Sequence, residues 1–333
     1  MKTFQKSSIH LLLLLFVGCL LSCTDDRIEF DTRPNKLSQP GGAIASSRIV
    51  HISEDTLTLE LEVYIFNRFG VPFLDLLETD LTLQSNNALE FSLDGLDLKS
   101  GDEDVAYDAG ILIDQSGSMS SNDPQNLRIT AGKDFLSKLG AQDKVAVAAF
   151  SSRLNNGWNL LGNLTSDGTL YLDELDALSG KEGGGTPLFF STFEMISYIS
   201  QNGTNDRKAV IALTDGKNTD GGASLSSVIS HAIDQGVRVY TVGLSRDVDF
   251  DILSDMAATT GGAFMWAAEA PQLLAMFGTL GRLLEGSADT FISTWQVSSP
   301  TGSFRSGQRV SGSILVTMPS GFQFEIPFSV AIP

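Results

Sequence analysis

Residues 107–118 read YDAGILIDQSGS, and this stretch decides the fold of the chain. Tyr107 to Ile113 forms a near-continuous apolar run of strand length, which predicts a strand that is covered on both faces. Asp114 and the polar residues QSGS follow directly after this run. Ligands of parallel sheets bind beyond the carboxyl ends of the strands, so these polar residues are a candidate binding site.

The segment from about Ala106 to Gly286 alternates strand-like and helix-like patterns. Further apolar strands are expected at residues 144–150, 209–213, 237–244 and 263–267. Helical patterns follow them or separate them, at residues 123–139, 186–199, 225–235, 250–257 and 272–285. The first helix is expected to start at Asp123-Pro124, because Asp caps a helix and Pro suits its first position. This alternation predicts an α/β fold with a doubly wound, mostly parallel sheet.

Three short loops in this segment carry candidate metal ligands, and we expect all three at the carboxyl ends of strands. They read DQSGS at 114–118, GGGTP at 183–187 and TDG at 214–216. Their candidate ligands are Asp114, Ser116, Ser118, Thr186 and Asp215. A set of oxygen ligands without imidazole or thiol favours a hard divalent cation over zinc or copper. We expect Mg2+ first, with Mn2+ or Ca2+ as alternatives. Such residues also form turns and helix caps, but that role explains one loop better than three.

The same loops resemble the metal-ion-dependent adhesion site (MIDAS) of von Willebrand factor type A (VWA) domains. The resemblance lies in Asp-x-Ser-x-Ser after the first strand, a threonine in a glycine-rich loop, and Asp-Gly after a later strand. It covers roughly residues 107–285 and continues past the site in GVRVYTVGL at 236–244 and TGG at 260–262. The resemblance implies a VWA fold, which is similar to the Rossmann fold.

The resemblance also implies roles for the five residues. Ser116 and Ser118 would coordinate the metal directly, whereas Asp114, Thr186 and Asp215 would do so directly or through water. A Glu or Asp carboxylate from a protein partner would complete the coordination shell. The expected function is therefore metal-dependent protein binding, as an adhesion or scaffold protein. The alternative is a structural or assembly lipoprotein of the cell envelope whose metal only rigidifies the loops.

The amino-terminal residues predict export and a lipid anchor. A short basic start precedes an eleven-residue apolar run, Leu11 to Leu21, which suits a signal peptide and is too short to span a bilayer. The run ends in LLSC, which resembles a bacterial lipobox and implies cleavage after residue 22 and lipidation of Cys23. Lipidation at Cys19, or an ordinary cleaved signal, remains an alternative. The expected location is the cell envelope, at the outer membrane, on its periplasmic or its surface-exposed face.

The segments on either side of the α/β region have a period of two. Residues 57–65 and 322–332 alternate apolar and polar side chains, which predicts half-buried strands. Neither flank alone has enough strands for a sandwich. We therefore expect one β-rich domain formed by residues 43–105 and 287–333, with the VWA domain at 106–286 inserted in it and a tether at 23–42. Two separate small β-modules are the alternative.

Composition excludes several classes of function. The net charge of −18 repels phosphate backbones and anionic headgroups, so no nucleic acid is expected and membrane contact is expected through the lipid anchor only. Cys19 and Cys23 are the only cysteines, which excludes a thiol nucleophile from the rest of the chain. No histidine lies near Ser116 or Ser118 in the sequence, and we expect no enzyme. The acidic run Asp102 to Asp104 could bind Ca2+ together with Asp108, but a solvated linker is expected.

Overall fold

The computed structural model describes residues 38–85, 88–300 and 302–333. The signal peptide expected at 1–22 and the lipidation expected at Cys23 lie outside these residues. Within the described ranges, no helix is long and apolar enough to cross a membrane.

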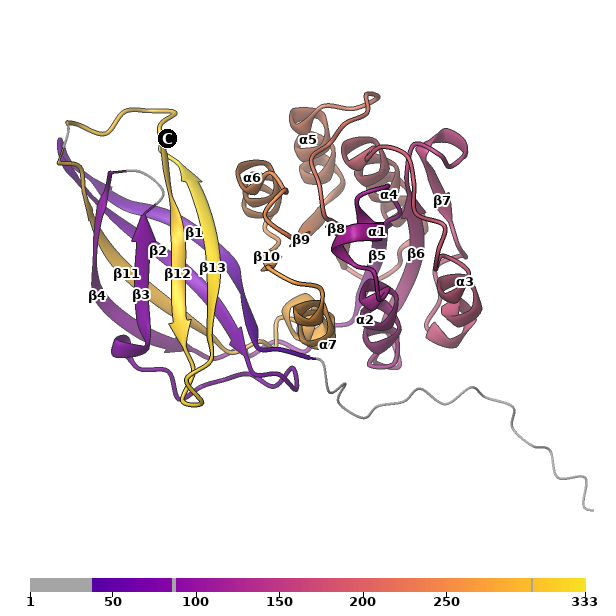
Figure 1. Ribbon diagram of the computed structural model, residues 1–333, viewed down its shortest axis with the longest axis horizontal. Helices are drawn as coiled ribbons and strands as arrows, with labels where there is room; N and C mark the ends of the chain where they lie inside the picture. The colour runs from indigo at the N-terminus through magenta and orange to yellow at the C-terminus, as the bar shows by residue number, and fades with distance from the viewer. Residues whose placement is uncertain (1–37, 86–87, 301) are drawn as a thin grey trace, which may run out of the picture.

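The α/β region is organised around parallel strands (Figure 1). β5 (Tyr107–Asp114) lies at the centre, between β6 (Lys144–Phe150) and β8 (Arg207–Thr214), and is parallel to both. β9 (Val237–Leu244) and β10 (Phe264–Ala267) continue the parallel sheet beyond β8. The short β7 (Trp158–Leu160) pairs antiparallel with β6 at the edge. The expected fold class, a mostly parallel α/β sheet of the VWA and Rossmann type, is confirmed.

Helices cover both faces of this sheet. α2 (Leu127–Leu136), α3 (Leu172–Asp176) and α7 (Pro271–Glu285) share one apolar core with the sheet. α4 (Leu188–Asn202), α5 (Leu225–Gln235) and α6 (Phe250–Thr260) form a second core on the opposite face. Single turns complete the set: α1 (Met119–Asn122) and the 3-10 helices η1 (Glu78–Asp80), η2 (Asn155–Gly157) and η3 (Gly168–Tyr171).

The start of α2 differs from the expectation. The helix begins at Leu127, not at Asp123-Pro124. The Asp123 side chain nevertheless accepts hydrogen bonds from the backbone N–H groups of Leu127 (2.7 Å) and Arg128 (3.0 Å). Asp123 therefore accepts hydrogen bonds from N–H groups of the first helical turn although it lies outside the helix. The prediction that Asp123 caps these groups is right, but the predicted position of the first helical residue is wrong.

Strands from both flanks pair with one another. β11 (Thr290–Ser298) lies between β2 (Thr56–Phe66) and β4 (Glu90–Lys99). In the second sheet, β12 (Arg309–Thr317) lies between β13 (Gln323–Ala331) and β3 (Leu81–Ser85). The two sheets enclose an apolar cluster that includes Leu59, Trp295 and Ile314. We call this part of the molecule the sandwich (Figure 1).

The sandwich and the α/β region share one continuous sheet of ten strands, in the order β4-β11-β2-β1-β10-β9-β8-β5-β6-β7. β1 (Gly41–Ile52) joins the two, because it pairs with β2 along its length and with β10 at Ala43 and Ile44. Gly41 and Gly42, which we assigned to the tether, are thus the first residues of β1. A Cβ atom on Gly42 would lie 2.3 Å from Ile326 Cδ1, so this glycine permits close packing rather than flexibility.

Candidate metal centre

Two of the three predicted loops lie at the carboxyl edge of the parallel strands. Asp114 is the last residue of β5, and Asp215 follows the last residue of β8. These strands are neighbours in register, with Ile113 opposite Leu213, so the two aspartates emerge side by side. Ser116 and Ser118 lie in the turn from β5 into α1.

The third loop was placed incorrectly. Residues 183–187 connect α3 to α4 and do not follow a strand. Backbone hydrogen bonds bring this loop to the sheet edge, from Gly183 N to Gln115 O (2.8 Å) and from Gly117 N to Gly184 O (3.0 Å). Gly184 has a φ of +84°, a conformation that favours glycine. The loop converges on the other two because its backbone is bonded to them.

The oxygen atoms of the predicted ligands converge. Ser118 Oγ donates to Asp215 Oδ1 over 2.7 Å and lies 3.2 Å from Ser116 Oγ. A Cβ atom on Gly216 would lie 3.9 Å from both Ser118 Oγ and Thr186 Oγ1, so these hydroxyls flank one point in space. Asp114 contributes through its neighbours: Ser116 N donates to its Oδ1 (2.7 Å). The geometry gathers all five residues, and their ligation of a metal stays a prediction.

Several residues that support this arrangement were missed in the sequence. Thr214 Oγ1 donates to Asp114 Oδ2 (2.7 Å), and Asn122 Nδ2 donates to Asp215 Oδ2 (2.9 Å). Thr219 fixes Thr186 twice, because its Oγ1 accepts from Thr186 N (2.8 Å) and its N–H donates to Thr186 O (3.1 Å). Each aspartate therefore keeps a defined orientation before any metal binds, which is how outer groups tune a metal site.

The two carboxylates lie in an environment that disfavours their negative charge. Burial and, to a lesser extent, the charge of Asp215 raise the pKa of Asp114 to about 6, against the hydrogen bonds from Ser116 and Thr214. Burial also raises the pKa of Asp215, although Ser118 and Asn122 oppose this. Both side chains are fully buried. Two adjacent buried carboxylates of this kind fit a bound cation, which would favour their charged forms.

The available side chains limit how a metal could be coordinated at this site. The described residues contain no group of three or more His, Cys, Asp or Glu side chains able to hold a metal. A cation at this edge would thus depend on hydroxyl oxygens and water as well as on the two aspartates. Ser118 is exposed whereas Asp114, Ser116 and Thr186 are buried, so the site opens to solvent on the side of Ser118.

Arg128 is a further residue that the sequence did not reveal. Its side chain is fully buried and pairs with Asp123 (2.9 Å) and Glu182 (2.6 Å). It also donates to Gln115 Oε1, in the loop at residues 114–118. Burial alone raises the pKa of Glu182, but the hydrogen bond and charge of Arg128 outweigh it, and the pKa is held below its usual value. Arg128 therefore ties α2 to the loops that carry Ser116 and Thr186.

The weaker sequence signals have structural roles. Asp108 is buried and accepts hydrogen bonds from Asn205 N (2.6 Å) and Asn205 Nδ2 (3.0 Å), while Glu103 pairs with Arg207. Asp108 and the acidic run thus have separate partners in the fold. His231 stacks on Phe193 with ring centroids 4.1 Å apart, which makes it a packing residue.

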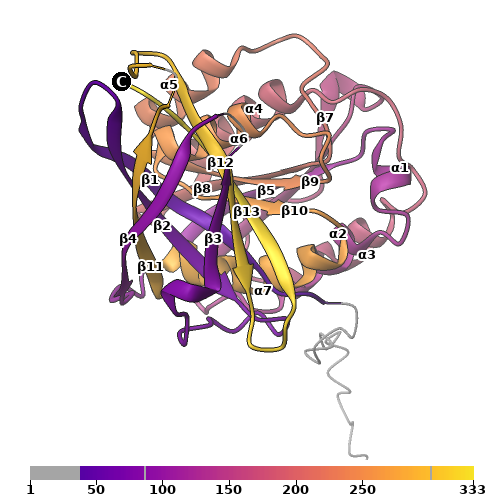
Figure 2. The ribbon, with the colours of Figure 1, turned by 60° about the vertical axis from the view of Figure 1, so that its left-hand side comes forward.

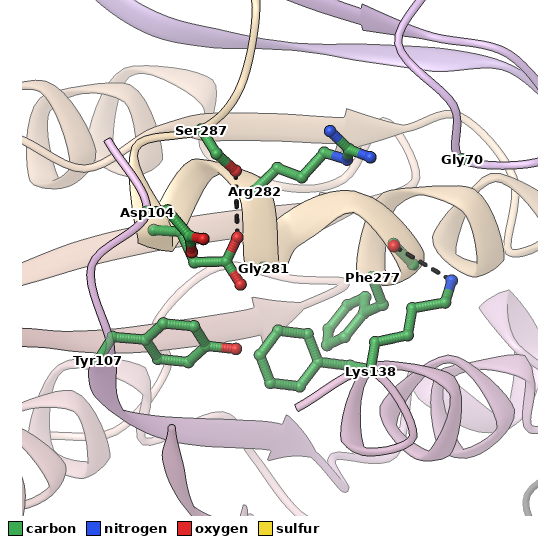
Figure 3. Close-up of a pocket in the computed structure, with 11 residues that line it drawn as sticks. Gly70, Asp104, Tyr107, Lys138, Phe277, Gly281, Arg282 and Ser287 are labelled. Atoms are coloured by element: carbon green, nitrogen blue, oxygen red, sulfur yellow. Dashed lines mark hydrogen bonds between the residues drawn. The ribbon is translucent and has the colours of Figure 1, made fainter. Parts of the chain in front are cut away.

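A pocket of about 470 Å³ lies at the opposite end of β5 (Figure 3). Tyr107, Phe277 and Arg282 line it, and Lys138 donates to the backbone of Gly278 at its rim (3.1 Å). Tyr107 begins β5 and Asp114 ends it, a span of about 23 Å at about 3.3 Å per residue. This pocket is thus separate from the metal loops. A second pocket of about 550 Å³ lies between the loop after β9 and the sandwich, lined in part by Lys217, Arg246 and Glu325.

Solved structures of several proteins are similar to this chain. Proximal thread matrix protein 1 from the mussel byssus is 18% identical over 54% of this chain and 48% of its own, with a TM-score of 0.45. A von Willebrand factor type A protein from Catenulispora acidiphila is 13% identical over 88% of this chain and 75% of its own, with a TM-score of 0.45. The pilus adhesin SpaC from Lactobacillus rhamnosus GG is 13% identical over 88% and 48%, with a TM-score of 0.45. The chain spans about half the length of the mussel protein and of the adhesin.

A family model matches part of the chain. The model for the von Willebrand factor type A domain matches residues 108–277, which is half of the chain. The match begins within β5 and ends within α7, so it includes all three metal loops. The chain belongs to the von Willebrand factor type A domain family.

Proposed function

We propose that the protein binds another protein through a divalent cation held by Asp114, Ser116, Ser118, Thr186 and Asp215. The observation that carries this proposal is the meeting of two buried carboxylates with hydroxyl groups at one solvent-open edge of the sheet. Hydroxyl ligands donate weakly, so a cation there keeps a net positive charge. An incoming Glu or Asp carboxylate would gain a strong ionic contact with it.

The acidic surface makes the metal a switch for this binding. With a net charge of −18, the protein repels a carboxylate partner when no cation is bound. Mg2+ is the proposed cation, with Mn2+ and Ca2+ as alternatives. One similar structure, of the mussel thread protein, is described as having a zinc occupied MIDAS motif, at 20% identity over 54% of this chain and 48% of its own, with a TM-score of 0.42. Zn2+ therefore belongs among the ions to be tested.

We also propose that the protein is not an enzyme. Ser118 Oγ bonds to Ser116 Oγ and donates to Asp215 Oδ1, a carboxylate that this proposal assigns to the metal rather than to proton transfer. His231, within the described residues, bonds to Ser197 on α4 (2.8 Å) and stacks on Phe193. Nucleophilic catalysis needs a base within hydrogen-bond reach of the hydroxyl. The arrangement at Ser116 and Ser118 favours coordination over nucleophilic attack.

The proposed location is the cell envelope, with the chain held by a lipid on Cys23. Metabolic labelling with an alkyne fatty acid tests this part alone. The wild-type chain should be labelled and the Cys23→Ser variant should not. Labelling that is lost only in Cys19→Ser would move the anchor to that residue.

Affinity capture from membranes tests the binding function. The wild-type chain should retain a partner in Mg2+ and release it in chelator, because the carboxylate loses its cation. Thr186→Ala and Asp114→Ala should behave like the chelator-treated protein. Ser120→Ala is the matched control, since Ser120 lies in the same turn and donates to Gly117 O (2.8 Å) without contacting the ligands.

The capture also distinguishes the structural alternative. If the variants keep the partner and lose only thermal stability, the metal rigidifies the loops and does not bind the partner. If the same proteins are captured by all variants in chelator, the edge of the sheet that carries the five proposed ligands is not the binding surface.

A further inference from the structure

Five large apolar side chains are exposed at one end of the sandwich. They are Phe69 (54% exposed), Val71 (52%), Leu74 (42%), Leu77 (64%) and Phe322 (37%). The first four belong to the loop between β2 and β3, and Phe322 belongs to the turn between β12 and β13. We call these five residues the apolar rim. Single exposed apolar residues are ordinary, but a group of them at one end of a molecule marks a contact surface.

The register of the strands brings the two parts of the rim to the same end. Leu81, at the start of β3, pairs with Val316, near the end of β12. The residues that precede Leu81 therefore lie beside the turn that contains Phe322. Figures 1 and 2 both show the β2–β3 loop and the β12–β13 turn at the lower end of the sandwich.

The rim has a defined backbone. Phe66 bridges to Pro72, and Phe73 N donates to Ile65 O (2.9 Å). Leu76 is buried in the sandwich core while Leu74 and Leu77 on either side of it are exposed. The exposed side chains are thus held outward by a loop that is itself packed, and they do not result from a loose segment.

The chain enters the fold beside this rim. Gly41, the first residue of β1, pairs with Phe66, the residue directly before the loop. Only the residues between Cys23 and Ser38 separate the proposed lipid anchor from the described fold. At about 3.3–3.6 Å per residue, this length of chain reaches at most about 50 Å. An anchor at Cys23 would thus hold the point where the chain enters the fold, which lies beside the rim, within about 50 Å of the bilayer.

We propose that the apolar rim contacts the lipid bilayer and orients the protein on it. This inference rests on the proposed lipid anchor and extends it, since membrane contact would no longer be through the anchor alone. The charged residues of the same loop are Arg68, Asp75, Glu78 and Asp80, so only one of the four is basic. The whole chain is acidic, so the favoured surface is zwitterionic lipid into which apolar side chains insert. In Figure 2, α1, which directly follows the loop with Ser116 and Ser118, lies to one side of this end rather than at it.

Tryptophan fluorescence on vesicles tests the proposal. The chain from Cys23 onward has a single cysteine, and it can be coupled to a maleimide lipid in phosphatidylcholine vesicles. Phe69→Trp should show a blue-shifted emission that lipids brominated on the acyl chain quench. Ile52→Trp is the matched control, because Ile52 is also exposed (42%) but lies at the far end of β1. The tryptophan added at position 52 should emit as a solvent-exposed one and should not be quenched by the brominated lipid, against the common background of the three native tryptophans.

The outcomes separate the rim from the anchor. Chemical coupling supplies the lipid, so this test does not depend on whether cells lipidate Cys23, which labelling decides separately. Quenching of Phe69→Trp that is no greater than that of Ile52→Trp would overturn the proposal. A blue shift that grows with protein concentration in the absence of vesicles would also overturn it, in favour of a second copy covering the rim.

Discussion

The two halves of the ten-stranded sheet pair their strands differently, parallel in the α/β region and antiparallel in the sandwich. In the parallel half, β5 is buried at every residue, and neighbouring strands end at the same edge. In the antiparallel half, β2 and β11 alternate buried and partly exposed side chains along much of their length, and neighbouring strands end at opposite edges. Only the parallel half can therefore gather several polar loops at one place. The antiparallel half gathers apolar side chains inside a sandwich.

The two halves should also differ in how much stability a mutation removes. The metal edge depends on buried charged groups, each with a specific partner, such as Arg128 with Asp123 and Glu182. The sandwich depends on apolar packing around residues such as Trp295 and Ile314. Loss of one partner leaves a buried charge uncompensated, whereas apolar cores accommodate small changes in volume. Mutations in the two halves should therefore differ in cost.

Removal of residues 287–333 should have the largest effect. It deletes β11, which pairs with both β2 and β4, and it deletes two strands of the second sheet. Leu57, Leu59 and Leu61 would then face solvent, so we expect aggregation, which size-exclusion chromatography would detect. A truncated chain that is monomeric and as heat-stable as the full chain would contradict a shared sandwich.

The isolated segment from about Glu103 to Gly286 provides the contrasting measurement. Its own helices cover both faces of the parallel strands, so we expect it to fold alone. It should nevertheless unfold at lower temperature than the full chain, because Tyr64 and Phe66 of β2 belong to the same apolar core. Circular dichroism during heating would measure this, and a segment without a cooperative transition would show that β1 and β2 are essential.

Among the single substitutions, Arg128→Met should lower the free energy of unfolding the most. It leaves the buried Asp123 carboxylate and Glu182 without their cation, which should lower the free energy of unfolding by about 3–5 kcal/mol in urea titrations. Lys133→Met is the control from the same helix. Lys133 pairs with Asp176, which is mostly exposed, and the expected loss is about 0–1 kcal/mol. Equal losses for the two variants would show that the buried Arg128 contributes no more to stability than Lys133 does.

Ile314→Val should have a smaller effect, because it removes one methylene group from the sandwich core. Ile314 is fully buried on β12, and the expected loss is about 0.5–1.5 kcal/mol in the same titrations. A loss as large as that of Arg128→Met would mean that the apolar half is no more tolerant than the metal edge.

The sequence patterns predicted the strands and turns that depend on residues close together in the chain. The strand at Tyr107–Asp114 and the turn with Ser116 and Ser118 were found because an apolar run ends directly in polar residues. The α/β class followed from the repeated alternation of such runs. Period-two alternation likewise identified β2 and β13 as strands with one buried face.

What depends on distant partners was missed or misplaced. The loop with Thr186 does not follow a strand and reaches the site through backbone bonds to Gln115 and Gly117. Arg128 looked like an ordinary helix residue, since its partner Glu182 is 54 positions away. Gly41 and Gly42 resembled a flexible tether, because their close contacts with Phe66 and Ile326 are not visible in a linear pattern.

Ser118→Ala should lower the stability of the fold no more than Ile314→Val does, since the Ser118 side chain is near the surface of the site. We expect a loss of about 0.5–1.5 kcal/mol at most, from the hydrogen bond to Asp215. Its effect on metal binding should be much larger than its effect on stability. This contrast separates a ligand from a structural residue.

Calorimetric titration of the chain from Asp25 onward with Mg2+ tests the central claim most directly. Mn2+, Ca2+ and Zn2+ serve as parallel titrants, and Ser120→Ala serves as the control for Ser118→Ala. The wild type and Ser120→Ala should bind about one ion per chain, in keeping with a single cluster of oxygen ligands, and Ser118→Ala should bind it more weakly. No heat and no thermal shift with any of these ions at millimolar concentration would contradict a metal site. Equal binding by Ser118→Ala would show that the ion lies elsewhere.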